Sequence, residues 1–233
     1  MLGAIGYYYN KPKHTEFVLH NFKNYYPNTS IVVINDGGSP ELKNIAEHFQ
    51  AKYIETTNLG FGDNLDDIEI MILWLERFFK AVEFIKEPYF IIMEDDVFIT
   101  KYINLDSIMG EIYGLNENAK LPEKVTDYLK NYNNNITNTH VVYSGAGGCI
   151  LKTDFFKSIA KEDWKTEIYT YAKLTKRFSK TEQSWYFNDC CLSFLCFRYG
   201  GNIIQNPEFI DLHVHPYRKD AAIIHHHHKI QFK

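Results

Sequence analysis

Apolar and polar residues alternate in segments along the first hundred residues, and these segments predict strands and helices in turn. Continuous apolar runs predict strands, because a strand that is covered on both faces of a sheet carries few polar residues. Segments with apolar residues three and four positions apart predict the helices between them. The predicted strands are residues 2–9, 30–35, 52–55 and 89–93, and the predicted helices are residues 15–25, 40–50 and 65–86. Strands that alternate with helices indicate β-α-β units, so we expect an α/β fold with a mainly parallel sheet.

Local signals favour two of these helices. Ser39 is a good N-cap and Pro40 a good first helical residue, so a helix is expected to begin there. The helix after the polar loop of residues 56–64 carries apolar side chains on one face, which we expect to pack in the core. That face consists of Ile68, Ile72, Leu75 and Phe79.

The second half of the chain shows weaker periodicity. Residues 104–138 are rich in asparagine, and we expect an irregular insertion there. Short strands are predicted at residues 141–143, 149–151 and 203–205. The tail from residue 211 onward is dense in histidine and shows no period, so no element is predicted in it.

Two further helices are predicted in this half. Thr153 is a candidate N-cap for a helix that begins at residue 154. Thr181 or Glu182 is expected to begin a second helix, which carries Asp189 and ends at the glycines of residues 200–201.

Composition and charge narrow the protein class. A length of 233 residues with 45% hydrophobic and 23% charged residues is typical of a single globular domain. The formal net charge is −4 and the sequence pI is about 6.2. Because binding to nucleic acid needs an excess of clustered basic residues to neutralise phosphates, we exclude nucleic acid as a partner.

The sequence shows no pattern typical of a membrane or secreted protein. The longest apolar candidate, residues 68–85, is interrupted by charged residues, so no membrane span is predicted. We also find no secretion signal at the N-terminus. The cysteines include the adjacent pair Cys190 and Cys191 and no C-x-x-C motif, which suits reduced thiols better than a disulfide framework or a zinc site. We therefore expect a soluble, cytoplasmic protein.

An acidic cluster, Glu94-Asp95-Asp96, directly follows the predicted strand of residues 89–93. Ligands of open α/β sheets bind beyond the carboxyl ends of the strands, which is where these carboxylates would lie. Clustered carboxylates repel one another and favour a cation, and oxygen ligands suit Mg²⁺ or Mn²⁺. The alternative is a solvated acidic turn.

Two other strand ends carry polar and glycine-rich segments. Asp36 directly follows the second predicted strand, where its carboxylate can accept from a nucleobase or ribose, and Gly37 and Gly38 let a ligand approach closely. Residues 58–64 supply amide and backbone N–H groups at the end of the third strand, which suits a diphosphate. Each segment alone is equally compatible with an ordinary turn or loop.

Taken in order, these motifs resemble the nucleotide-sugar half of glycosyltransferases of the GT-A fold, specifically the family-2-like enzymes. The resemblance covers most of residues 1–100 and continues more weakly to the end of the chain. The motifs that carry it are Tyr9-Asn10, Asp36-Gly37-Gly38-Ser39, the loop from Asn58 to Asn64, Glu94-Asp95-Asp96, Gly147-Gly148 and Asn188-Asp189.

The resemblance implies a GT-A (Rossmann-like) single domain over residues 1–233. Residues 1–100 would hold the nucleotide sugar and the metal, and residues 101–233 would supply the acceptor half and a tail that closes the metal site. The implied activity moves a hexose from a nucleotide diphosphate sugar, most simply a UDP-sugar, to an acceptor hydroxyl of a saccharide or another molecule. The implied donor-binding residues are Tyr8, Tyr9, Asp36, Asn64, Asp95, Gly147 and Gly148, and the implied carboxylate metal ligands are Glu94 and Asp96.

Asp189 is the candidate base that takes the proton from the acceptor hydroxyl in an inverting displacement. The chain departs from the usual Glu-Asp pair, because Asn188 stands in the place of the glutamate. A surface position on a helix is the structural alternative, and in a retaining transferase Asp189 would position the acceptor instead. Trp185 is a candidate for stacking on a sugar ring, with burial in the core as its alternative.

Histidines near the C-terminus complete the metal site in many GT-A enzymes. A motif similar to theirs places this role on His225 or His226, and the segment His213-Val214-His215 competes for it. Imidazole beside carboxylates favours Mn²⁺ over Mg²⁺. A catalytically silent carbohydrate-binding or nucleotide-sugar-binding relative is the alternative function.

Overall fold

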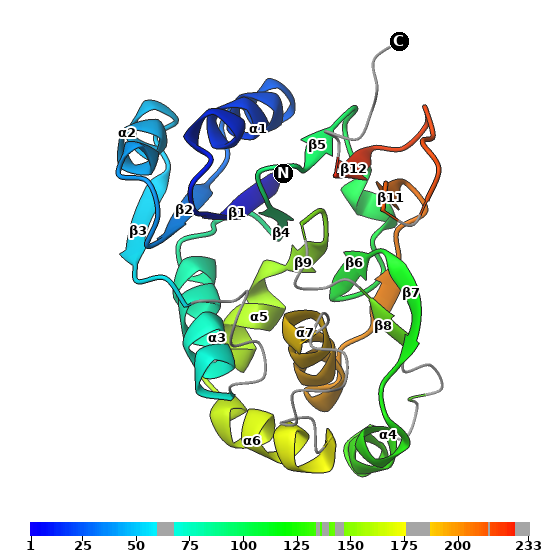
Figure 1. Ribbon diagram of the computed structural model, residues 1–233. Coiled ribbons are helices and arrows are strands. Elements are labelled where there is room, and N and C mark those ends of the chain that lie inside the picture. The colour runs from blue at the N-terminus through cyan, green and yellow to red at the C-terminus, as the bar shows by residue number, and fades with distance from the viewer. Residues whose placement is uncertain are drawn as a thin grey trace.

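A seven-stranded sheet with helices on both faces forms the centre of the molecule (Figure 1). The strand order is β10-β6-β9-β4-β1-β2-β3, and within this sheet only β9 runs antiparallel to its neighbours. The expected α/β fold with a mixed, mainly parallel sheet is therefore confirmed. The computed structural model describes residues 1–59, 68–133, 136, 140–142, 147–175, 187–213 and 215–226.

The first hundred residues form the elements that their apolar pattern predicts. Predicted and observed strand ends differ by at most one residue. The helix α1 begins three residues earlier than predicted, because Pro12 has a fixed φ that suits a first helical position and the N–H of Thr15 already bonds the carbonyl of Lys11. The bounds are β1 (Leu2–Tyr8), α1 (Pro12–Tyr25), β2 (Ile31–Asp36), α2 (Glu41–His48), β3 (Lys52–Thr56), α3 (Ile68–Val82) and β4 (Tyr89–Met93).

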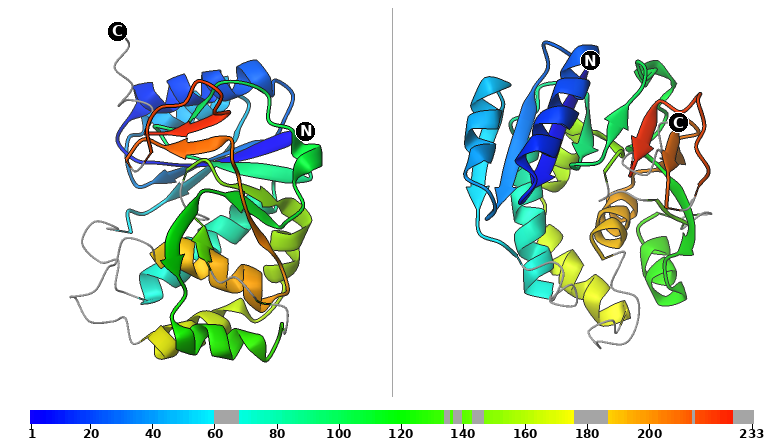
Figure 2. Two further views of the ribbon diagram at one scale, coloured as in Figure 1. Left: turned by 90° about the vertical axis from the view of Figure 1, so that its right-hand side faces the viewer. Right: turned by 45° about the horizontal axis from the view of Figure 1, so that its top comes forward.

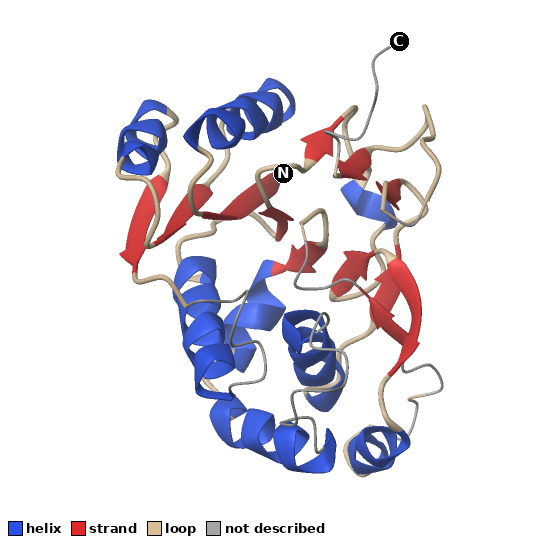
Figure 3. Cartoon of the chain, viewed as in Figure 1, coloured by secondary structure: helices blue, strands red, loops and turns tan. Residues whose placement is uncertain are grey.

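The helix α3 forms much of the core on one face of the sheet. The predicted core residues Ile72, Leu75 and Phe79 are buried, as expected. Trp74 and Phe78 are buried as well, so the apolar surface of α3 is wider than one stripe. The helices α1 and α2 cover the opposite face of β1, β2 and β3 (Figure 3).

The expectation of an irregular insertion at residues 104–138 is wrong. This segment contains the strand β6 (Ile112–Gly114), which joins the central sheet between β9 and β10. A three-residue strand is too short to show a period of two, so the sequence pattern could not reveal it. The other elements there are the 3-10 helix η1 (Leu105–Ser107), β7 (Asn116–Lys120) and α4 (Glu123–Lys130).

The predicted capping role of Thr153 is also wrong. The helix α5 begins at Thr153 itself, and Lys152 occupies the N-cap position without a side-chain hydrogen bond. The helix α6 was not predicted. The end of α7 agrees with the prediction, because Gly200 has a φ of 80° just after the last helical residue, whereas residues 181 and 182 lie outside the described part of the chain. The elements are β8 (His140–Val142), β9 (Ile150–Lys152), α5 (Thr153–Ile159), α6 (Trp164–Thr175), α7 (Phe187–Arg198) and β10 (Ile203–Gln205).

A second, three-stranded sheet forms from the tail for which no element was predicted. It consists of β11 (Phe209–Asp211), β12 (Ile223–His225) and β5 (Phe98–Ile99), in the order β11-β12-β5. β12, in red, lies beside β11, in orange, in both views of Figure 2, and it pairs with β5 on its other side. The sheet thus joins the end of the chain to the segment that follows the acidic cluster.

All four cysteines are buried as thiols, with Cys190, Cys191 and Cys196 in α7. Among the described residues, none of the helices combines the length and the apolar character that crossing a membrane requires.

Candidate functional site

The carboxyl ends of the parallel strands meet at one edge of the central sheet. Tyr8 at the end of β1 pairs with Asn35, Asp36 at the end of β2 pairs with Thr56, and Met93 ends β4 beside β1. The candidate residues that follow these strands therefore lie along the same edge, as expected for a ligand site of an α/β sheet.

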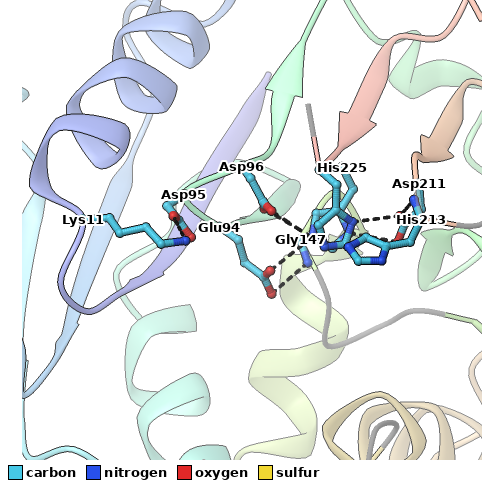
Figure 4. Close-up of polar contacts among 9 residues, drawn as sticks. Lys11, Glu94, Asp95, Asp96, Gly147, Asp211, His213 and His225 are labelled. Atoms are coloured by element: carbon cyan, nitrogen blue, oxygen red, sulfur yellow. Dashed lines mark hydrogen bonds and ion pairs between the residues drawn. The ribbon is translucent and has the colours of Figure 1, made fainter. Parts of the chain in front are cut away.

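Glu94 and Asp96 face the tail of the chain across this edge (Figure 4). Oε2 of Glu94 lies 3.2 Å from Nε2 of His225, and Oδ1 of Asp96 lies 3.4 Å from the same nitrogen. Oδ2 of Asp96 lies 3.7 Å from Nε2 of His226. The structure thus brings together all four residues that were predicted as metal ligands.

Strand pairing explains why His225 reaches the acidic cluster. β12 runs antiparallel to β5, with Ile224 opposite Phe98. Continuing this register by one residue places His225 beside Val97, next to Asp96. The strand β12 therefore places His225 next to Asp96, which is 129 positions earlier in the sequence.

His226 uses an unusual backbone conformation to face the same site. Successive side chains of a strand point to opposite faces, so His226 would normally point away from His225. Its φ of 58° lies in the left-handed region, which turns the chain at this residue. The two imidazole rings stack with centroids 3.9 Å apart and planes inclined by 27°.

Asp211 lies behind the two histidines. Its Oδ2 lies 3.2 Å from Nδ1 of His225 and its Oδ1 lies 2.8 Å from Nδ1 of His226. The backbone N–H of His213 donates to Oδ1 at 2.7 Å. Burial disfavours the charged carboxylate, but the hydrogen bonds from His225, His226 and His213 outweigh it and hold the pKa of Asp211 well below its ordinary value.

The charge of His225 depends on the same contacts. Burial disfavours its imidazolium form, whereas Asp211, Asp96 and Glu94 favour it and raise the pKa of His225 well above its ordinary value. The cluster therefore stabilises a positive charge at the position where three carboxylates converge.

The donor set fits a divalent cation of the Mn²⁺ or Mg²⁺ type. Octahedral coordination at about 2.1 Å places neighbouring ligand atoms about 3 Å apart. The separations of 3.2, 3.4 and 3.7 Å between the carboxylate oxygens and imidazole nitrogens are close to this spacing. Ligand atoms of Asp96, His225 and His226 all lie within 4.8 Å of one another, so one ion can reach each of them.

Asp95 points away from the other two members of the acidic cluster (Figure 4). Its Oδ2 lies 2.6 Å from Nζ of Lys11, which follows β1. This ion pair raises the pKa of Lys11, chiefly through the side-chain hydrogen bond. Asp95 was predicted to bind the nucleotide sugar, and the structure places it at the edge of the site next to a cation that the sequence analysis did not single out.

Asp36 is held by a residue that sequence reasoning missed. Nη1 of Arg77, from α3, donates to Oδ1 of Asp36, and Oγ1 of Thr56 approaches the same oxygen at 3.4 Å. Burial is the larger influence on Asp36 and raises the pKa of its carboxyl, although Arg77 opposes it. The available signal was an arginine inside a strongly apolar helix, where an unpaired charge would be costly.

The residues at the end of β1 lie against the turn that follows β2. Tyr8 is buried, and burial raises the pKa of its hydroxyl, whereas Tyr9 is 46% exposed. The N–H of Ser39 donates to the carbonyl of Tyr9 at 2.9 Å. A Cβ at Gly38 would lie 2.1 Å from that carbonyl oxygen, so only glycine fits this close approach.

Gly147 and Gly148 lie in the turn that leads into β9. The N–H of Gly147 donates to Oε1 of Glu94 at 3.1 Å, which ties this turn to the acidic cluster. Gly148 has a φ of 100°, and a Cβ there would lie 2.6 Å from the ring of Phe209. Both glycines were predicted to bind the nucleotide sugar, and the structure places them at the junction between the two sheets.

Three predicted residues are described incompletely. Asn64 and Trp185 lie outside the described residues. Asp189 lies in the first turn of α7, and its side chain is not described. The roles assigned to these residues stay predictions.

The competing histidine segment lies next to the site. The ring centroid of His213 lies 3.7 Å from that of His226, with the planes inclined by 65°. Asp96, His225 and His226 form the group with suitable ligand spacing among the described residues, and His213 is not part of it. The geometry thus favours His225 and His226 for this role.

Comparison with known proteins identifies the fold. No protein-family model and no curated protein sequence matches the chain. Solved structures do match. The galactosyltransferase LgtC, crystallised in complex with donor and acceptor sugar analogs, aligns with a TM-score of 0.57 and 14% identity over 96% of this chain and 86% of LgtC.

Two further solved structures also match the chain. An active-site mutant of LgtC aligns with a TM-score of 0.57 and 12% identity, with the same coverage. TarS of S. aureus aligns with a TM-score of 0.45 and 14% identity over 68% of this chain and 29% of TarS. The alignment over nearly the whole of both chains shows that this protein has the GT-A fold of LgtC.

Proposed function

We propose that the protein is a metal-dependent glycosyltransferase that moves a hexose from a UDP-sugar to an acceptor hydroxyl. The observation that carries the proposal is the convergence of Glu94, Asp96, His225 and His226 beyond the end of β4, in a chain with the fold of a galactosyltransferase. Mixed oxygen and imidazole ligands favour Mn²⁺, with Mg²⁺ as the alternative. A bound divalent cation would neutralise the charge that develops on the departing diphosphate.

Different residues along the sheet edge contact different parts of the donor. Asp36, oriented by Arg77, accepts from the ribose or nucleobase of the donor. The turn at Gly38, which touches the backbone of Tyr9, forms one wall of that pocket. Asp95 lies at the edge of the site, paired with Lys11, and its carboxylate can accept from a ribose hydroxyl when Lys11 moves aside.

Asp189 is the proposed base, and inversion at the anomeric carbon stays a prediction. The backbone of α7 carries Asp189 in its first turn. An inverting transfer requires a base that takes the acceptor proton, whereas a retaining transfer would leave Asp189 to position the acceptor. The anomeric configuration of the product, read by NMR, distinguishes the two outcomes.

A nucleotide release assay tests the proposed activity. The protein is incubated with UDP-, GDP-, CDP- and dTDP-sugars, with and without Mn²⁺, and the release of nucleoside diphosphate is followed. We expect release from a UDP-sugar that needs Mn²⁺. The variant Asp96→Asn should lower this rate by at least about 100-fold, because it removes a negative charge from the cation site and replaces a carboxylate ligand by a weaker amide oxygen.

The exposed acid Asp127, on α4, provides the matched control. Its side chain is 60% exposed and pairs only with Lys130 among the contacts described. Asp127→Asn should release nucleotide at the wild-type rate. Metal-independent release, or a wild-type rate in Asp96→Asn, would contradict the metal assignment. Donor binding without any release or transfer would instead identify a silent nucleotide-sugar-binding relative.

A further inference from the structure

The carboxylate of Asp211 is buried deeply, in the tail for which the sequence predicted no element. Its side chain is 2% exposed, and burying a carboxylate is costly unless hydrogen bonds compensate. Among the described residues, Asp211 and Glu87 are the buried carboxylates. Contact with solvent therefore does not account for a carboxylate at the position of Asp211.

Strand pairing places Asp211 directly beside a proposed metal ligand. β11 and β12 run parallel, and their register pairs Asp211 with His225. The backbone around Asp211 is fixed as well, because its carbonyl accepts from the N–H of His215 at 2.8 Å. The carboxylate therefore has a defined position relative to the histidines.

The contacts of Asp211 determine which nitrogen of each ring is available to a metal. An ionised carboxylate can only accept hydrogen bonds, so Nδ1 of His225 and Nδ1 of His226 must each carry a proton. In the neutral rings, Nε2 then keeps its lone pair. These Nε2 atoms are the ones that face Glu94 and Asp96.

We infer that Asp211 is a positioning residue that orients two consecutive histidines, His225 and His226, toward one cation site and fixes the tautomer of both. The inference rests on the proposed metal-dependent function. One carboxylate serves both rings because His226 adopts a left-handed backbone conformation and stacks on His225. Partners of this kind commonly contribute 10-fold to 100-fold to metal affinity.

Replacement by asparagine separates this role from simple packing. The backbone N–H of His213 donates to Oδ1 at 2.7 Å, so the amide oxygen of an asparagine keeps that place and can still accept from His226. The amide nitrogen then faces Nδ1 of His225. Because that nitrogen is a donor, it favours the His225 tautomer with its proton on Nε2, which cannot bind a metal.

The experiment measures Mn²⁺ binding by electron paramagnetic resonance of the free ion, without any sugar donor. The variants are Asp211→Asn, His225→Ala and the double variant, with unfolding midpoints recorded for each in the absence of metal. Glu87→Gln is the matched control, since Glu87 is buried at the opposite end of the sheet and accepts from the backbone N–H of Ser30.

We expect Asp211→Asn to weaken Mn²⁺ binding by about 10-fold to 100-fold, and Glu87→Gln to leave it unchanged. In the His225→Ala background the same substitution should weaken binding by less than about twofold, because its effect passes through His225. Unchanged binding in Asp211→Asn would overturn the inference. An equal loss with and without His225 would overturn it too, since a general charge or packing effect would then be responsible.

Mn²⁺ binding by the wild type and the unfolding midpoint of each variant distinguish a failure of the inference from a failure of the proposed function. Wild-type protein that fails to bind Mn²⁺ would overturn the proposed metal site, and the inference with it, whereas wild-type binding with no effect of Asp211→Asn overturns the inference alone. If Asp211→Asn lowers the unfolding midpoint strongly, Asp211→Leu provides a second test. It removes the acceptor from both histidines and is expected to weaken Mn²⁺ binding at least as much, and binding as in the wild type would contradict the inference.

Discussion

The two sheets contribute to the candidate site in different ways. The central sheet supplies Glu94 and Asp96 from the end of β4, a strand whose core residues are completely buried. The small sheet supplies His225 from the end of the three-residue strand β12 and His226 directly after it, and both imidazole rings contact Asp211. The comparison shows that the carboxylates sit on the stable part of the fold, whereas the histidines depend on a local arrangement of hydrogen bonds and close contacts.

The largest effect should come from the histidines themselves. His225 contacts Glu94 and Asp96 and is 6% exposed, whereas His226 contacts Asp96 at the longer distance of 3.7 Å and is 21% exposed. We expect His225→Ala to weaken Mn²⁺ binding by about 100-fold and His226→Ala by about 10-fold. Calorimetric titration with Mn²⁺ measures both. A larger effect of His226→Ala than of His225→Ala would contradict the arrangement of the two histidines described above.

Gly148 tests how the two sheets are joined. A Cβ at this position would lie 2.6 Å from the ring of Phe209 in β11 and 3.0 Å from Ile223 in β12. We expect Gly148→Ala to lower the free energy of unfolding by about 1–3 kcal/mol, because it adds steric overlap to a left-handed φ of 100°. Urea denaturation gives this value.

Gly200 is the matched control for Gly148. It also has a positive φ, of 80°, but a Cβ there meets no atom within 4 Å. Gly200→Ala should therefore lower the free energy of unfolding by about 1 kcal/mol from backbone strain alone, and should leave Mn²⁺ binding unchanged. Equal Mn²⁺ affinity of Gly148→Ala and Gly200→Ala would show that the junction of the two sheets at Gly148 does not position the histidines.

Arg77 tests the donor side of the central sheet. Arg77→Met leaves the carboxylate of Asp36 without its ion pair, so we expect UDP to bind about 10-fold more weakly and the free energy of unfolding to fall by about 1–3 kcal/mol. Arg198, which pairs with Glu167 at 2.7 Å, provides the control. Arg198→Met should destabilise the fold similarly without changing UDP affinity, and a loss of UDP affinity in both variants would contradict the specific role of Arg77.

Lys11 should give the smallest effect. Its side chain is 61% exposed, and exposed ion pairs contribute little to stability. Lys11→Met is expected to change the free energy of unfolding by less than about 1 kcal/mol, measured by urea denaturation. A larger change would mean that Asp95 and Lys11 belong to the stable part of the sheet edge and do not form an adjustable pair.

The contrast between the two sheets also explains what the sequence could predict. Strands β1 to β4 have five to seven residues each, and β1, β2 and β4 have strong apolar character, so their positions and the acidic cluster after β4 could be identified. The strands β5, β6, β11 and β12 have two or three residues each, and their pairing depends on partners far away in the chain. Local periodicity carries no information about such pairing.

The site residues follow the same division. His225 and His226 were predicted as ligands only through resemblance to a family motif, and Asp211 was not predicted at all, because a single aspartate in a short apolar segment gives no local signal. Arg77 was visible only as a charge inside an apolar helix. Its partner, Asp36, is 41 positions away, so only the folded structure reveals the pair.

Anomalous X-ray scattering from crystals grown with Mn²⁺ and UDP tests the central claim most directly. We expect one strong anomalous peak about 2 Å from a carboxylate oxygen of Asp96 and from Nε2 of His225, with the diphosphate beside it. The same crystals of Asp96→Asn should lack this peak. A wild-type structure that binds UDP with no anomalous peak between Asp96 and His225, or with the peak on other residues, would contradict the claim that the two sheets together form the cation site.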